Sequence, residues 1–318
     1  MNDHPRISET TKRKVREKAK ELGYMVFHHA RVLRTQKTFT IGIIVPDIRN
    51  PFFLDFLYGV EKILFPRKYK ILLSMSNENV EKEKQYIEWL VEHGTDGILV
   101  SPAFDEDGKG NLNLLTKVKG MGIPVVLYDR LYEDRPKNFD SVTIDNFGAV
   151  FDVIKYLHSK GHRDIGMILA NGKIYTMKKR YEGYLEGCRN LKMNCRRALD
   201  ISDIFDHQEF KKICNYISKE PMSAVIATSH FVTKEIYRCV KSLGWKIPKD
   251  ISVVGFDDID ENELFNPPVT VIKQPVSLIG KAAATLLLER VDKDNSPLQS
   301  VVFKAELIER SSVKNITK

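Results

Sequence analysis

Polar residues that could hold a ligand follow several short apolar runs of the sequence. Carboxylates and amides predominate among them, and two aromatic residues, Phe52 and Phe53, stand beside the first group. The set comprises Asp47, Asn50, Asp129, Arg130, Asp145, Asn146, Ser229, His230, Asp257 and Asp258. Such residues suit a polyhydroxylated ligand, because acceptor atoms meet hydroxyl groups while ring faces cover C–H surfaces. The pattern predicts a sugar pocket, although each acid taken singly could equally cap a following helix.

The apolar runs themselves have the length and composition of buried parallel strands. They are rich in Val, Ile and Leu and are apolar on both faces. They cover residues 40–47, 69–76, 96–102, 124–130, 164–170, 223–228 and 251–258. Segments with helical spacing lie between them, at 53–64, 81–94, 180–191 and 232–244. This alternation predicts doubly wound parallel sheets in two lobes, with ligands bound beyond the carboxyl ends of the strands.

Other kinds of site find no support in the motifs. The sequence lacks the glycine-rich signatures of dinucleotide and NTP binding, the G-x-S-x-G elbow and the H-E-x-x-H zinc motif. The cysteines have no C-x-x-C spacing, so unpaired thiols in a reducing cytoplasm are expected. They are Cys188, Cys195, Cys214 and Cys239. We therefore predict no enzyme, no cofactor and no metal site.

The charge of the chain is concentrated at its N-terminus. Residues 1–38 hold ten Lys or Arg against four acids, so they carry +6 of the net charge of +8. This asymmetry predicts contact with a polyanion, with nucleic acid as the first candidate and a solvated basic helix as the alternative. No apolar run approaches the roughly 18 residues of a membrane span, and the charged N-terminus is unlike a signal peptide. The prediction is a cytoplasmic protein without membrane contact.

Taken in order, a series of stretches resembles the lactose-repressor (LacI/GalR) family of bacterial transcription regulators over nearly the whole chain. They are NDHPRIS…KAKELGY, ARVLRTQKT, IGIIVPDIRNPFF, GTDGILVSP, PVVLYDR, DSVTIDN, GHRDIGMI, RYEGY, SVVGFDDID and NPPVTVIKQP. The resemblance implies an α/β fold with a periplasmic-binding-protein-like (type I) two-lobed core of doubly wound parallel sheets. A partial helical DNA-binding headpiece and a hinge helix would precede this core.

The resemblance also implies domain boundaries. The third helix of the headpiece would occupy 1–25, the hinge helix and linker 26–38, and the effector-binding core 39–318. The N-lobe of the core would take 39–142 and 274–302, and the C-lobe 143–273 and 303–318. In the family NDHPRIS follows the recognition helix, so that helix would lie upstream of Met1. A start codon assigned too late is the favoured explanation, with a trimmed chain or a natural fragment as alternatives.

The hinge helix is the part of the implied DNA-binding apparatus that the sequence contains. The resemblance places it at Ala30, Arg31, Leu33, Arg34 and Thr35. Leu33 would be the wedge that enters the minor groove, with Arg34 as its cationic neighbour. The alternative for Leu33 is a linker residue packed on the core.

For the effector site, the resemblance singles out residues from both lobes. They are Phe52 and Phe53 as aromatics, Asp129 and Asp257 as hydroxyl acceptors, Arg180 as charged donor, and Ser229 and His230. The last two stand where many sugar-binding members have Asn-Asp, so a sugar or a sugar acid is expected. The resemblance thus implies a ligand-responsive repressor that binds operator DNA as a homodimer. The alternatives are an effector-binding module without operator recognition and a periplasmic-type sugar-binding protein.

Overall fold

A computed structural model describes residues 7–22, 37–105, 108–132, 138–201, 206–219, 221–293 and 296–317. The chain divides into two compact units, Met1–Phe39 and Thr40–Lys318. Within the described parts, no helix is both long and apolar enough to cross a membrane. The predicted hinge residues Ala30, Arg31, Leu33, Arg34 and Thr35 lie outside the described residues.

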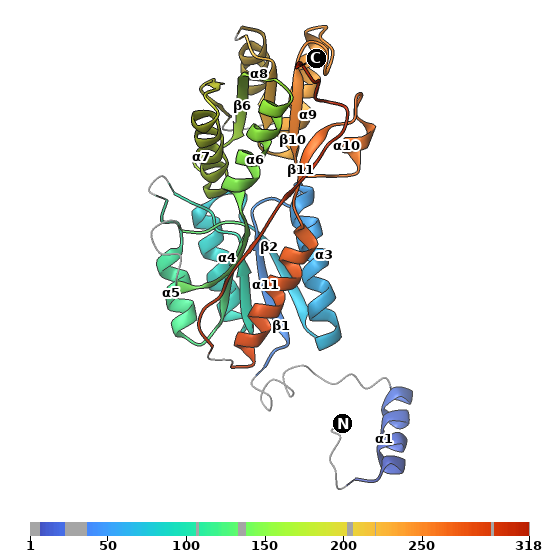
Figure 1. The fold of residues 1–318 in the computed structure, drawn as a ribbon. Coiled ribbons are helices and arrows are strands. Elements are labelled where there is room, and N and C mark those ends of the chain that lie inside the picture. Colours follow the sequence, from blue (N-terminus) through green and yellow to red (C-terminus); the bar gives the residue numbers. More distant parts are fainter. Residues whose placement is uncertain are drawn as a thin grey trace. The chain divides into compact units, whose positions relative to one another are not determined.

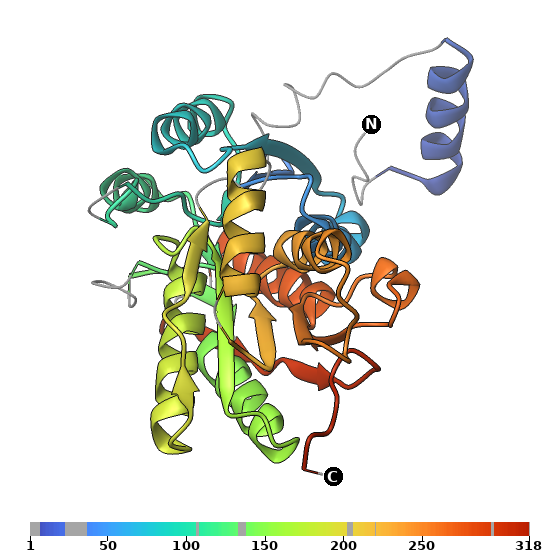
Figure 2. The ribbon, with the colours of Figure 1, turned by 90° about the horizontal axis from the view of Figure 1, so that it is seen from above.

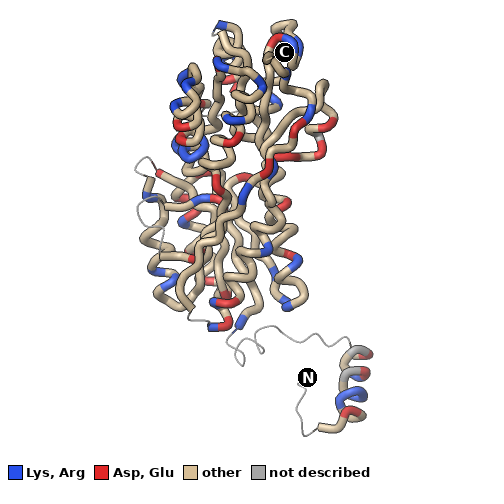
Figure 3. Tube along the Cα trace, in the orientation of Figure 1, with Lys and Arg blue, Asp and Glu red and all other residues tan. Residues whose placement is uncertain are grey.

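The first unit contains a single described helix, α1 (Glu9–Glu21). Ser8 precedes it, and the Ser8 hydroxyl accepts a hydrogen bond from the backbone N–H of Thr11 at 3.3 Å, as is typical of a helix N-cap. Both basic and acidic residues lie along the helix (Figure 3), and Lys12 pairs with Glu9 at 2.7 Å. Its apolar residues Val15 and Leu22 are exposed.

The second unit begins with a six-stranded parallel sheet, here called the first sheet. Its strand order is β12-β5-β4-β3-β1-β2. The strands are β1 (Thr40–Val45), β2 (Lys70–Met75), β3 (Gly97–Val100), β4 (Val125–Tyr128), β5 (Asp140–Ile144) and β12 (Ser300–Phe303). The inner strands β3, β4 and β5 are buried along their whole length. Continuous apolar runs form such strands because both of their faces are covered.

Helices cover both faces of the first sheet. They are α3 (Pro51–Leu64, followed by the 3₁₀ turn η1, Phe65–Arg67), α4 (Val80–Glu92), α5 (Leu112–Gly120) and α11 (Val276–Val291). One core cluster joins α4 and α5 to the sheet through residues such as Ile87, Leu115 and Leu127. Helices α3 and α11 lie side by side (Figure 1). A Cβ at Gly59 would lie 2.2 Å from the carbonyl oxygen of Ser277, so this crossing requires glycine.

The second sheet has the strand order β13-β11-β10-β9-β6-β7, with β8 also paired to β6. Its strands are β6 (Asp164–Ala170), β7 (Asn194–Cys195), β8 (Leu199–Ile201), β9 (Ala224–Ala227), β10 (Ser252–Phe256), β11 (Thr270–Lys273) and β13 (Glu306–Ile308). Only the edge pair β11–β13 is antiparallel among the described pairings. The chain passes between the two sheets after β5, after β11 and after β12 (Figure 1).

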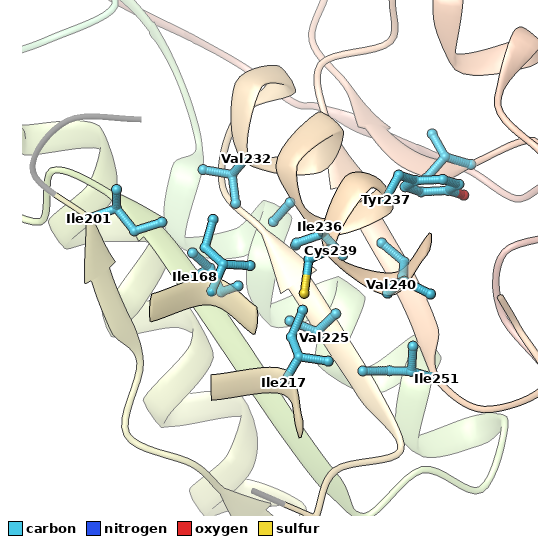
Figure 4. Packing of buried hydrophobic residues seen from close by; sticks show 14 of the residues in the cluster. Ile168, Ile201, Ile217, Val225, Val232, Ile236, Tyr237, Cys239, Val240 and Ile251 are labelled. Atoms are coloured by element: carbon cyan, nitrogen blue, oxygen red, sulfur yellow. The ribbon is translucent and has the colours of Figure 1, made fainter. Parts of the chain in front are cut away.

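Five described helices accompany the second sheet: α6 (Asn146–Ser159), α7 (Tyr175–Asn190), α8 (His207–Lys219), α9 (His230–Ser242) and the short α10 (Glu261–Leu264). Helices α6 and α7 pack side by side (Figure 2). Beneath α8 and α9 lies an aliphatic cluster that includes Ile168, Ile217, Val225 and Ile236 (Figure 4). The fold is thus the predicted α/β arrangement of two mainly parallel sheets.

The expectation that all four cysteines are unpaired is wrong for one pair. Cys188 near the end of α7 forms a disulfide with Cys195 on β7, and their Cα atoms are 5.9 Å apart. Cys214 and Cys239 are free. The chain turns back between α7 and β7, and this return brings together two cysteines whose spacing resembles no known motif.

Candidate functional site

Two aspartates end the central strands of the two sheets in the same unusual backbone conformation. Asp129 follows β4 with φ 62°, and Asp257 follows β10 with φ 69°. Each still continues its ladder, because the N–H of Asp129 donates to Val142 at 3.0 Å and that of Asp257 to Ile272 at 2.9 Å. Aspartate is one of the few residues that tolerates the left-handed region. The two carboxylates lie close enough for Asp257 to raise the pKa of Asp129.

Arg180 on α7 is buried between elements of the second sheet, with only 3% of its surface exposed. Its Nε donates to Asn146 Oδ1 at 2.8 Å, and its Nη1 donates to the carbonyl of Thr228. The guanidinium carbon lies 3.5 Å from the centre of the Phe256 ring. The start of α6 and the ends of β9 and β10 therefore fix its position. These contacts leave Nη2 without a hydrogen-bond partner among the described residues.

Electrostatics link Arg180 to the two aspartates. Burial lowers the pKa of Arg180 to about 10, and the charges of Asp257 and Asp129 oppose that effect. Burial raises the pKa of Asp129, while Arg130 and Arg180 lower it. Arg180 therefore remains a cation at neutral pH. The structure brings together one cationic fork and two carboxylates contributed by different sheets.

Arg130 is a second buried guanidinium beside Asp129; it belongs to the polar set predicted from the sequence, but the resemblance does not select it for the effector site. Its Nη1 and Nη2 donate to the two carboxylate oxygens of Glu78 at 2.6 and 2.7 Å. Nη1 also donates to the carbonyl of Pro102 at 3.3 Å, and Nε lies 3.4 Å from Asp129 Oδ2. Its position directly after Asp129 was the available signal. The sequence could not reveal that residues after β2 and β3 would surround it.

The two predicted aromatic residues have different surroundings. Asn50 caps α3 by accepting from the N–H of Phe52 at 3.0 Å, which turns the start of the helix toward the strand ends. Phe52 lines a pocket of about 290 Å³ together with Asp257 and Gln274. Phe53 packs edge-on against Tyr128, with ring centres 6.4 Å apart. The lining of this pocket thus includes Phe52 and Asp257 but not Asp129, Arg180 or Phe53.

Gln274 is a further polar residue of this pocket that sequence reasoning missed. It follows β11, where the chain passes from the second sheet toward α11. Its Nε2 donates to Asp257 Oδ1 at 2.6 Å. Its Oε1 is buried and has no hydrogen-bond partner among the described residues. The signal was the same as for the aspartates, a polar residue directly after an apolar strand.

Other members of the polar set prove to be caps or ion-pair partners. Asp145 caps α6 by accepting from the N–H of Gly148 at 2.8 Å. Ser229 caps α9 by accepting from the N–H of Val232 at 3.3 Å. Buried His230 is the first residue of α9, and Asp258 pairs with Arg310 at 2.9 Å. Among the described residues, no group of three or more His, Cys, Asp or Glu could hold a metal ion.

Comparison with known proteins identifies the family. Residues 154–313 match the periplasmic binding protein-like domain. The HTH-type transcriptional regulator RegA of Clostridium saccharobutylicum is 30% identical over 98% of this chain and 93% of its own length.

Two solved structures add ligands to this comparison. A LacI family transcriptional regulator from Enterococcus faecium with bound ribose is 25% identical, with a TM-score of 0.74, and the match covers 87% of this chain and 99% of that one. A periplasmic binding protein/LacI transcriptional regulator from Alkaliphilus metalliredigens with D-xylulofuranose is 26% identical, with a TM-score of 0.72, covering 86% and 98%. The chain belongs to the LacI/GalR family and is a ligand-responsive transcriptional regulator.

Proposed function

We propose that this regulator senses a pentose-type sugar and acts at operator DNA as a cytoplasmic homodimer, with no enzymatic activity. The carrying observation is the buried Arg180, whose pKa is raised by the charges of both Asp129, which follows a strand of the first sheet, and Asp257, which follows a strand of the second. A planar guanidinium can donate to two vicinal hydroxyls, and each carboxylate can accept from a further hydroxyl. Phe52 supplies an apolar face for the C–H side of the ring.

The balance of charge favours a neutral sugar over a sugar acid. Two carboxylates border Arg180, and Arg130 is already held by Glu78 in a two-bond ion pair. A ligand carboxylate would meet Asp129 and Asp257 at short range and would be repelled. The two relatives that carry ribose and D-xylulofuranose support the pentose class.

Such a ligand would contact both sheets at once. The position of one sheet relative to the other would then depend on whether the ligand is bound. The polypeptide crosses between the sheets near Gln274, which bonds Asp257. Closure of two lobes around a ligand is an established way to change the conformation of a segment that is connected to them. In this protein the linked segment would be the basic stretch 1–38, with its net charge of +6, which would contact DNA.

A calorimetric titration of the protein with a panel of sugars tests the proposal. D-Ribose, D-xylulose, a hexose and a sugar acid are compared at one pH and one salt concentration. We expect a pentose to bind more tightly than the sugar acid and to raise the midpoint of thermal unfolding. Saturation at 100 times Kd would stabilise the fold by about 2.7 kcal/mol. Binding of the sugar acid alone would contradict the proposed ligand class.

A further inference from the structure

Glu83 is a buried carboxylate that the proposed ligand contacts do not use. It lies on α4, and its side chain is fully buried. Oε2 accepts from the backbone N–H of Ala103 at 2.7 Å, and Oε1 accepts from Asn111 Nδ2 at 3.0 Å. Burying a carboxylate is costly unless its oxygens are bonded, and here both are. Both partners belong to the segment between β3 and the first turn of α5.

The bond to Ala103 connects Glu83 to the candidate site. The N–H of Ala103 and the carbonyl of Pro102 belong to one peptide group. Glu83 accepts from the N–H of this group, while Arg130 Nη1 donates to its carbonyl at 3.3 Å. Two buried charged side chains therefore hold the same peptide group at opposite ends. Arg130 in turn lies beside Asp129, at 3.4 Å from Nε to Oδ2.

We propose that Glu83 is a positioning residue for the ligand site, because it fixes the Pro102–Ala103 peptide and through it the Arg130 guanidinium beside Asp129. The inference rests on the proposed function, since Asp129 is assigned there as a ligand acceptor. Glu83 itself bonds to Ala103 and Asn111 and would not touch the ligand.

The chemistry of the Glu83 contacts requires a carboxylate. Both of its partners, the Ala103 N–H and Asn111 Nδ2, are donors. Glutamine offers a single acceptor oxygen, so a Glu83→Gln variant would leave one of these donors facing an NH₂ group. The substitution removes the charge and one hydrogen bond with almost no change of volume.

The ionisation of Glu83 offers a readout that a purely structural role would not share. Burial raises the pKa of Glu83 to about 7, and the charge of Glu78 also raises it. The hydrogen bonds from Asn111 and Ala103 and the charge of Arg130 lower it. The other titratable groups that act on it are the Tyr128 and Tyr132 phenols, whose pKa values are also raised by burial. Protonation of Glu83 would remove one acceptor, as the glutamine variant does. Between about pH 8 and about pH 6 the carboxyl changes from mainly charged to mainly neutral.

The test titrates the wild type, Glu83→Gln and the control Glu88→Gln with D-ribose at about pH 6 and about pH 8. Glu88 is an exposed residue of the same helix. We expect Glu83→Gln to weaken D-ribose binding about tenfold at the higher pH. This is the size of effect expected from the loss of one hydrogen bond to a charged group. Wild type and control should lose affinity toward the lower pH, and Glu83→Gln should lose less. Asp129 is present in all three proteins, so its own titration cancels in the comparison.

Hydrogen–deuterium exchange provides a second measurement that needs no ligand. We expect faster exchange in Glu83→Gln around Ala103 and around Arg130, and in the wild type at the lower pH after correction for intrinsic rates. Unchanged exchange around Arg130, or an unchanged ribose affinity in Glu83→Gln, would overturn the positioning role. A wild type that binds no pentose would refute the proposed function instead, and the exchange result would still decide on Glu83.

Discussion

Backbone conformation separates the aspartates that cap helices from those available to a ligand. Asp145 follows β5 and has φ −72°, so its carboxylate turns back onto the N–H of Gly148 at the start of α6. Asp129 and Asp257 have positive φ, and neither carboxylate caps a helix. The Asp129 carboxylate instead lies 3.4 Å from Arg130 Nε, and the Asp257 carboxylate accepts from Gln274 Nε2. Sequence position alone makes the three residues equivalent, and the dihedral angle makes them different.

Replacing Arg180 by alanine is expected to reduce sugar affinity by at least about 30-fold, because each hydrogen bond from a charged donor contributes roughly 1.5–3 kcal/mol. The matched control is Arg189→Ala on the same helix, where the guanidinium is exposed and pairs with Glu186 at 2.9 Å. Calorimetry measures both affinities, and circular dichroism verifies the fold. An affinity for Arg180→Ala within a few-fold of the wild type would remove Arg180 from the site.

For single residues, the sequence indicates which residue types could bind a ligand, but it does not show which residues contact one another in the fold. Asp129 and Asp257 could be selected because they follow strands, whereas Arg180 was selected only through the resemblance to the family. Gln274 and Arg130 could not be ranked, since their significance depends on bonds to Asp257 and Glu78 from other strand ends. The hydroxyl of Ser229 has a capping role that sequence reasoning left open.

Among the elements, the crossing of α3 and α11 is the most tightly constrained. A Cβ at Gly280 would lie 2.2 Å from the carbonyl of Phe56, as one at Gly59 would from that of Ser277. Both obstacles are backbone atoms, which cannot move aside as a side chain end can. The close approach brings the start of α11, which directly follows Gln274, against the helix that carries Phe52.

A Gly59→Ala substitution should therefore destabilise the protein by about 1–3 kcal/mol through forced separation of the two helices. Gly120→Ala is the control, because a Cβ there meets nothing within 4 Å and the residue lies at the end of α5. That control should leave the stability unchanged or raise it by up to about 1 kcal/mol. Urea unfolding measures both, and equal midpoints for the two variants would contradict the packing argument.

Each strand and helix segment predicted from apolar runs and helical spacing between residues 40 and 258 contains an element of the structure, because these patterns are strong signals. No strand was predicted over β5, β7, β8, β11, β12 or β13. The residues of β12 and β13 are exposed or half-buried, as expected for strands at sheet edges, and the runs are too short to stand out. The antiparallel direction of β13 depends on the path back from the first sheet, which local patterns do not encode.

For the molecule as a whole, an exposed apolar stripe on α3 points to self-association. Leu54 and Tyr58 are spaced for one helix face, and Phe65 lies just beyond its end. Tyr58 is 59% exposed and Phe65 72% exposed. Exposed apolar side chains that gather on one part of a surface are typical of an interface. Because α3 also carries Phe52, which lines the pocket with Asp257, the proposed homodimer would connect the two proposed ligand sites through this helix.

A Leu54→Asp/Tyr58→Asp double variant is expected to convert the dimer into a monomer, since two carboxylates would be buried without partners in the interface. Light scattering after size exclusion measures the mass over a range of concentrations. Met121→Asp is the control, because Met121 is equally exposed but lies after α5, away from this stripe. Both proteins should bind D-ribose with wild-type affinity, since the substituted side chains do not line the pocket. A double variant that stays dimeric would place the interface elsewhere, and one that loses ribose affinity as well would mean that dimerisation and the ligand site are coupled through α3.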